Sequence, residues 1–420
     1  MGRIQKIQKR DTLRNRSIPC GLVVSLLLAI LLSSCATTYK RVRPDKKKVV
    51  LESVQTEIPE PLLLDVRIQT FDLGELPSSE NESRGISSEI RQAESKYMAV
   101  QLKHALYQTG YWGSVRVVPA ESSGDEVRVT GRILKSNGEE LKLKIEAFDA
   151  VGRQWFEKDF KGAVNEQMYK GKSGEQVEVF QNVYYQIANE LAAYYKTMTP
   201  DQIFELRQVS EMRFAKGLVP SAFTGYLQKN EKTGRFIIDR LPSEDDEMLA
   251  RVRRVRERDY MLVDTLDVNY EGLNRDMREV YTNWRKSRLL EMNMIREVDD
   301  AKNKEMLKGG LLVLSGAALG VLYAESEGSN SAIPVLIGAA VGAGVSKIFE
   351  ADKIKKEAEI NKAALEELGV SFAAEVEPTV LKVEGETIEL TGSAEAKYEQ
   401  WQEVLEKLYQ VETGAETFTK

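Results

Sequence analysis

The stretch that decides the organisation of this chain is Gly309–Ser346, with the sequence GGLLVLSGAALGVLYAESEGSNSAIPVLIGAAVGAGVS. It contains two uncharged runs, Gly309–Tyr323 and Ala332–Val345, of 15 and 14 residues. The residues between the runs are rich in Glu, Ser, Gly and Asn, which favours a turn. Two apolar runs joined by a polar turn predict a helical hairpin.

Glycines recur at helical spacing in both runs, at positions 316, 320, 338, 342 and 344. Glycines four residues apart lie on one face of a helix and allow two backbones to approach closely, an arrangement that suits helix packing in lipid. We therefore predict that the hairpin packs through Gly316, Gly320, Gly338, Gly342 and Gly344.

The length of the runs leaves the environment of this hairpin open. A spanning helix usually needs about 20 apolar residues, whereas each run covers only about 21–23 Å as a helix. The hairpin is therefore either inserted into a membrane or buried in the core of this chain or of an oligomer. In composition it resembles the glycine-zipper segments of bacterial envelope lipoproteins.

The amino terminus reads as a targeting segment. A basic stretch that ends at Arg16 precedes the apolar run Gly21–Leu32, and Leu32-Ser33-Ser34-Cys35 follows. This order is typical of a secretory signal peptide, and the last four residues resemble the lipobox of bacterial lipoproteins. The resemblance implies that residues 1–34 are removed and that Cys35 carries fatty acyl chains, palmitate among them. The alternative is an uncleaved anchor helix, for which the apolar run is short.

The residue after the lipobox is Ala36. The sorting rule of the lipoprotein family uses Asp at this position for retention in the inner membrane, so Ala36 implies the outer membrane, with the protein on its periplasmic face. Several acyl chains on one terminus give stable anchoring. The chain has two cysteines, Cys20 and Cys35, so we expect the mature protein to hold no free thiol.

Composition argues against most kinds of chemistry. The chain has 420 residues with a net charge of −6, and no basic excess indicates nucleic acid. It has no phosphate-cradling loop. His104 is the single histidine, and a zinc or haem site needs clusters of His or Cys. We predict that the protein is not an enzyme and holds no cofactor or metal.

An α/β domain is predicted over residues 61–196. Its pattern is a strand, an amphipathic helix, four more strands and a closing helix, with a hairpin turn at Ser136–Glu139. Helices on one face of a largely antiparallel sheet are the economical packing. The expected elements are Leu62–Phe71, Ile86–Thr109, Ser114–Val118, Glu126–Lys135, Leu141–Phe148, Gln154–Phe160 and Val177–Tyr195.

This domain weakly resembles the TolB amino-terminal type of domain, which also occurs in the curli secretion channel lipoprotein. The likeness is carried by Leu62–Phe71 as first strand, by Leu106–Gly110 at the end of the helix, and by Val129–Ile133 leading into the later strands. It implies a binding or assembly module without catalysis.

The region after this domain reads as helical. Thr199 and Pro200 favour a helix start, and Gly272 predicts a break or bend in the long charged helix that follows. The basic run Arg251–Arg258 is interpreted as a solvated helix face, with contact to phospholipid headgroups as the alternative. We expect residues Phe223–Arg240 to be irregular.

The sequence of the last part of the chain, roughly Ile360–Val411, predicts a helix, two strands and a final helix. Charged helices enter and leave the glycine-rich hairpin on the same side, like a stalk. The final helix presents a stripe of large apolar side chains at helical spacing. This part weakly resembles half of a BON domain, a module associated with phospholipid binding, and the alternative is a small αββα cap. The stripe consists of Tyr398, Trp401, Leu405, Leu408 and Tyr409.

We thus expect an α+β protein: an N-terminal α/β sandwich-like domain, long charged helices with a glycine-rich helical hairpin, and a small C-terminal αββα cap. The leading hypothesis is an outer-membrane lipoprotein that acts as a structural or assembly component of an envelope complex, as a homo-oligomer or with other envelope proteins. The alternative is a periplasmic binding adaptor for lipid, peptidoglycan or a protein. The expected segments are 1–34 signal peptide, 35–60 lipidated tether, 61–196 α/β domain, 197–308 helical region, 309–346 glycine-zipper hairpin, 347–412 helix and cap, and 413–420 tail.

Overall fold

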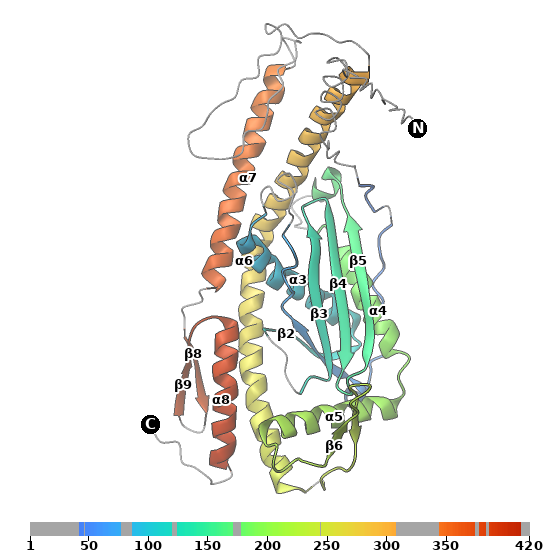
Figure 1. Ribbon diagram of the computed structural model, residues 1–420, viewed down its shortest axis with the longest axis vertical. Coiled ribbons are helices and arrows are strands. Elements are labelled where there is room, and N and C mark those ends of the chain that lie inside the picture. The colour runs from blue at the N-terminus through green and yellow to red at the C-terminus, as the bar shows by residue number, and fades with distance from the viewer. Residues whose placement is uncertain are drawn as a thin grey trace, which may run out of the picture. The chain divides into compact units, whose positions relative to one another are not determined.

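A five-stranded mixed sheet with helices packed around it forms the centre of the α+β fold (Figure 1). The computed structural model describes residues 42–45, 47–76, 86–119, 124–170, 178–243, 245–307, 344–373, 378–383 and 386–412. The strand order is β2-β1-β3-β4-β5. These strands are β1 Leu64–Gln69, β2 Trp112–Val118, β3 Val127–Ser136, β4 Glu140–Asp149 and β5 Gln154–Ala163.

The sheet is more parallel than the sequence predicted. β1 runs parallel to both of its neighbours, β2 and β3, whereas β3, β4 and β5 form an antiparallel meander. The first strand and the second are joined by a helix, α3 (Ser88–Thr109), and a helical crossover returns the chain in the same direction. The prediction of a largely antiparallel sheet is therefore wrong for β1 and β2.

Helices α3 and α4 (Gln181–Tyr195) pack against each other and against the sheet. The ends of α3 follow local chemistry, because the Ser87 hydroxyl accepts from the Ile90 amide and Gly110 adopts a left-handed conformation with φ 73°. The apolar stripe expected on this helix is buried, as predicted: Ile90, Ala93, Tyr97, Val100, Leu102 and Leu106.

The hairpin turn between β3 and β4 is confirmed. Gly138 has φ +83°, and the Asn137 side chain accepts from the amides of Glu139 and Glu140. A Cβ at Gly138 would lie 2.2 Å from the carbonyl oxygen of Arg285, so only glycine fits where the long helix passes over this turn.

Helix α5 (Pro200–Leu218) starts where Thr199 and Pro200 predicted, and a capping box forms between Thr199 and Gln202. The following segment is not irregular throughout, because β6 (Leu227–Lys229) and β7 (Phe236–Ile238) form a short antiparallel hairpin. These three-residue strands are too short to leave a clear alternating pattern in the sequence.

Helix α6 spans Glu247–Leu307 without interruption, so of the predicted break or bend at Gly272 the break is wrong. Tyr270 and Leu273 on either side of this glycine are buried. Their burial outweighs the roughly 1 kcal/mol that a glycine costs in a helix.

The charged sequence predicts a stalk here, but α6 packs along β2, α3 and the short helix η2 (Glu166–Lys170). Helix α7 (Gly344–Ala373) lies beside α6 and also contacts α3 (Figure 1). The two helices that flank the glycine-rich stretch therefore pack together, and α6 is continuous with the core of the α/β domain.

The carboxyl-terminal part has the predicted order, with β8 (Thr379–Val383) and β9 (Glu386–Leu390) as a hairpin before α8 (Ala394–Glu412). The predicted stripe on α8 is buried and packs on α6, where the Tyr409 hydroxyl contacts the Met248 sulfur. The resemblance of this part to a BON domain stays a prediction.

Two groups of predicted features lie outside the described residues. They are the signal peptide with Cys35, and Gly316, Gly320, Gly338 and Gly342 of the hairpin. Gly344 is the first residue of α7. Among the helices that the structure describes, none combines the length and the apolar character needed to cross a membrane.

Candidate functional site

The most distinctive arrangement in the described chain is a row of polar contacts between α6 and the α/β domain, many of them buried. Several charged or polar residues of α6 are at most a few per cent exposed, although the helix is charged along its length. We call this row the polar seam. On α6 it comprises Asp259, Asp264, Asp267, Glu271, Asn274, Tyr281, Arg285 and Arg296.

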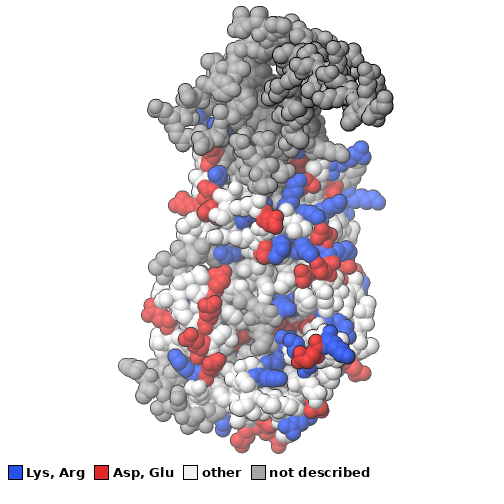
Figure 2. Space-filling view, in the orientation of Figure 1, with Lys and Arg blue, Asp and Glu red and all other residues white. Residues whose placement is uncertain are grey.

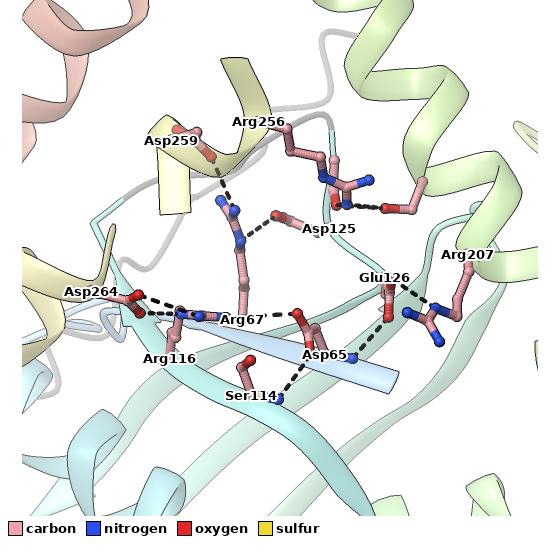
Figure 3. Close-up of polar contacts among 12 residues, drawn as sticks. Asp65, Arg67, Ser114, Arg116, Asp125, Glu126, Arg207, Arg256, Asp259 and Asp264 are labelled. Atoms are coloured by element: carbon pink, nitrogen blue, oxygen red, sulfur yellow. Dashed lines mark hydrogen bonds and ion pairs between the residues drawn. The ribbon is translucent and has the colours of Figure 1, made fainter. Parts of the chain in front are cut away.

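The first part of the seam surrounds Arg67 of β1 (Figure 3). This side chain is buried, and its guanidinium lies 3.1 Å from Asp259 and 3.4 Å from Asp125. Burial lowers the pKa of Arg67, but the two carboxylates outweigh burial and raise that pKa above its ordinary value. The sheet and α6 thus share a buried charge that Asp125 and Asp259 neutralise.

Arg116 of β2 forms a second bridge to α6. Its guanidinium contacts Asp264 at 2.5 Å and Asp65 of β1 at 3.6 Å (Figure 3). Three guanidinium groups lie near the ring of Tyr260 on α6. Arg116 is 5.1 Å from the ring centroid, and Arg67 and Arg256 are each 5.6 Å from it. An aromatic face stabilises such cations, so Tyr260 is a further point of attachment.

Helix α5 joins the same cluster. Arg256 of α6 donates to the carbonyl of Gly124 at 2.8 Å and to the hydroxyl of Ser210 at 2.7 Å (Figure 3). Nearby, Arg207 lies 3.7 Å from Glu126, and burial raises the pKa of Glu126. The cluster therefore ties together three layers: the sheet, α5 and α6.

The middle of the seam contains the single histidine. His104 Nε2 lies 2.9 Å from Glu271, which also pairs with Lys103 at 2.7 Å, and Lys103 contacts Asp267. Burial acts to raise the pKa of Glu271, but hydrogen bonds from His104 and Lys103 outweigh burial and lower the pKa to about 2. Asp267 also accepts from the amide of Val117 at 2.8 Å, which fixes α6 to β2.

The last part of the seam is the most deeply buried. Arg285 makes a bidentate contact with Glu178 at 2.7 and 2.9 Å and lies 4.2 Å from the ring centroid of Tyr281. The Tyr281 hydroxyl donates to Glu94 at 2.6 Å. Further along, Arg296 pairs with Glu139 of the β3–β4 turn at 2.8 Å.

The chemistry of the seam is that of a structural connection. Buried ion pairs gain little net stability over apolar packing, but breaking one is costly. Each contact forms only when α6 lies in a single register against the sheet, and a shift of one helical turn of about 5.4 Å would separate every pair. The seam therefore fixes the position from which α6 leaves the domain.

A hollow of about 380 Å³ lies where β1 ends, α3 begins and α8 approaches. It is lined by Phe71, Gln92, Ser95, Lys96 and Glu395, among others. The Ser95 hydroxyl is already occupied, because it donates to the carbonyl of Phe71. Among the described residues, no group of three His, Cys, Asp or Glu side chains is placed to hold a metal ion.

Of the predicted site residues, the structure describes only Gly344. Cys35 and the predicted glycines other than Gly344 lie outside the described residues. His104, which was not predicted to form a site, lies in the seam beside Glu271. The seam was not predicted from the sequence, because dense charge on a helix is typical of a solvated face. The basic run Arg251–Arg258 contains both exposed and inward-facing side chains. Arg253 is exposed and pairs with Glu211 at 2.6 Å, whereas Arg256 points inward.

Comparisons of this chain with protein-family models, with curated proteins and with solved structures found no match.

Proposed function

We propose that this protein is an outer-membrane lipoprotein on the periplasmic face, acting as a structural or assembly component of an envelope complex. In this proposal Cys35 carries the lipid anchor. The glycine-rich stretch 309–346 joins copies of the chain, through Gly316, Gly320, Gly338, Gly342 and Gly344, or inserts into the membrane.

The observation that carries the proposal is the pairing of α6 with α7 on the two sides of this stretch. α6 is held in one register by the polar seam, from Asp259 to Arg296. A domain whose two exit helices are packed and fixed can present a glycine-rich hairpin in a defined position, which assembly by close helix packing requires.

The anchor is tested by cell fractionation. The native protein should enter the membrane fraction and incorporate labelled palmitate, whereas Cys35→Ser should lose the label. Cys20→Ser is the matched control, since Cys20 lies in the segment that is expected to be removed. Palmitate incorporation into Cys35→Ser, or none into the native chain, would refute lipidation at this residue.

A periplasmic adaptor is the second candidate. The hollow beside β1, α3 and α8 favours it, because it brings Lys96, Gln92 and Glu395 to one concave surface. Deleting residues 309–346 separates the two functions. An adaptor would keep its partner after the deletion, whereas an assembly component would lose its oligomeric state.

A further inference from the structure

Three segments that are far apart in the sequence meet at one end of the sheet. The amide of Asp45 donates to the carbonyl of Ala163 at 2.9 Å, and the amide of Val164 donates to the carbonyl of Glu139 at 2.9 Å. The start of the described chain, the end of β5 and the β3–β4 turn are therefore neighbours. We call this the entry end and define it by Asp45, residues 137–139 and Ala163.

Helix α6 reaches the entry end and continues past it. Arg296 contacts Glu139 there, and eleven residues remain before α6 ends at Leu307, or about 16 Å of helix. Helix α7 lies beside α6 and begins at Gly344 (Figure 1). By connectivity, the chain before Asp45 and the chain between Leu307 and Gly344 both leave from this end.

The entry end also gathers positive charge on the open face of the sheet. Lys135, Lys142 and Lys161 are direct cross-strand neighbours on β3, β4 and β5. Like charges opposite one another destabilise a sheet. Lys135 is compensated by Glu140, and Lys142 by Asp159 at 2.7 Å.

Within the described residues, Lys161 forms no ion pair, and neither do the exposed Arg43, Lys47 and Lys48 nearby. The acidic side chains at this end are Asp45, Glu139, Glu140 and Glu166. Arg296 pairs with Glu139, and Glu166 pairs with Lys170 at 3.0 Å. Figure 2 shows Lys and Arg side chains gathered along the upper right of the molecule, where the sheet ends. Cations therefore exceed carboxylates at the entry end.

We infer that the entry end faces the membrane and binds the headgroups of anionic phospholipids. The inference rests on the proposed anchoring at Cys35, which is ten residues before Asp45 and thus within about 36 Å of it even when fully extended. A basic cluster held this close to an anionic surface is attracted to it. The lipid anchor and the glycine-rich stretch would then both lie on the side of the domain that faces the membrane.

The opposite end of the sheet provides a matched control. The β6–β7 hairpin docks there, because the amide of Phe236 donates to the carbonyl of Val151 at 2.8 Å beside the β4–β5 turn. β4 runs from one end to the other, which places the two ends about 30 Å apart. The hairpin carries the exposed cations Lys229, Lys232 and Arg235.

The orientation is tested with lipidated protein in vesicles of phosphatidylethanolamine and phosphatidylglycerol. Lys161→Cys or Lys232→Cys introduces one thiol for a fluorophore, because the mature chain is expected to have no other free thiol. Quenching by a headgroup-attached quencher should be strong at position 161 and weak at 232. Equal quenching at both positions, or stronger quenching at 232, would overturn the orientation.

Headgroup binding is tested by flotation of the mature chain with Cys35→Ser. Arg43→Glu, Lys47→Glu, Lys48→Glu and Lys161→Glu together should weaken binding to phosphatidylglycerol vesicles by about tenfold or more. The same number of reversals at Lys216, Lys229, Lys232 and Arg235 should leave binding within about twofold.

Binding that is equal on phosphatidylcholine vesicles, or that survives the reversals at the entry end, would overturn headgroup recognition. These outcomes are separate from the proposed function. Flotation reads the charge of the folded body without the lipid anchor, so it can succeed even where palmitate labelling shows that Cys35 is not acylated.

Discussion

Arg285 carries a charge into the core of the molecule, and its partner Glu178 is buried with it. Burial acts to raise the pKa of Glu178, but Arg285 outweighs burial and lowers it, so both groups keep their charges. The sequence could not reveal this pair, because the two residues are 107 positions apart and each resembles an ordinary surface charge.

Replacing one member of the pair should be costly. We expect Arg285→Met to lower the free energy of unfolding by about 3–5 kcal/mol, because it leaves Glu178 charged and unpaired in the core. The double variant Arg285→Met with Glu178→Leu should recover part of this loss. Urea unfolding gives the values, with the exposed Arg275→Met as control. A loss of less than about 1 kcal/mol for Arg285→Met would show that the pair is not buried in solution.

Glu271 makes the free energy of unfolding depend on pH in the acidic range. Its pKa is lowered to about 2 in the folded protein from an ordinary value of 4.5. A lowered pKa stabilises the folded state above pH 4.5, and this contribution is lost as the pH falls toward 2.

Because the Glu271 side chain is 30% exposed, we expect a loss of only about 1 kcal/mol. Glu271→Gln should remove this part of the pH dependence, whereas the exposed Glu279→Gln should not. Unfolding midpoints measured from pH 2.5 to 7 test the prediction. Identical pH profiles for native protein and Glu271→Gln would contradict it.

At the scale of elements, patterns that repeat along the chain were the most informative. Alternation and capping signals predicted α3, the β3–β4–β5 meander, α5 and α8 correctly. The short hairpin β6–β7 and the parallel pairing of β1 depend on contacts between distant segments. The polar seam depends on such contacts along its whole length, so local sequence could not predict it.

Gly272 shows how tertiary packing overrides a local signal. A Cβ at this position would meet only the end of the Arg275 side chain, at 3.8 Å, so the site is open. We expect Gly272→Ala to raise the free energy of unfolding by about 0.5–1 kcal/mol through better helix propensity. Thermal unfolding measures the effect, and a destabilised variant would indicate a break in α6.

The described part of the tether, residues 42–45 and 47–58, is also more ordered than its sequence suggested. The Asn182 side chain of α4 accepts from the amide of Val49 and donates to the carbonyl of Lys47, and Asn189 holds Glu52 and Val50 in the same way. Two side-chain amides two turns apart thus hold the backbone of this polar segment against α4.

Removing both amides should release this segment. Asn182→Ala with Asn189→Ala is expected to speed trypsin cleavage after Lys47 and Lys48 by about tenfold or more, since each amide makes two hydrogen bonds worth about 1 kcal/mol apiece. Gln186→Ala on the same helix is the control. Unchanged cleavage in the double variant would mean that other contacts hold the segment.

At the scale of the whole molecule, the sequence and the structure each supply one part of the account: the sequence indicates the attachment sites, and the structure shows how the domain holds the helices next to one of them. The sequence supplies an expected lipid anchor at Cys35 and a glycine-rich stretch at 309–346. The structure supplies the fixed helices α6 and α7 that border this stretch. Composition alone could not indicate that α6 packs against the sheet in one fixed register, because its exposed and its buried charged residues are of the same types.

The central claim is that copies of the chain assemble through the glycine-rich stretch. The most direct measurement is the mass of the detergent-purified protein, compared with that of Gly316→Leu plus Gly342→Leu. We predict oligomers for the native protein and a monomer for the double variant, because leucine prevents close approach of the helix backbones. Oligomers of the same mass in both proteins, or a monomeric native protein, would contradict the claim.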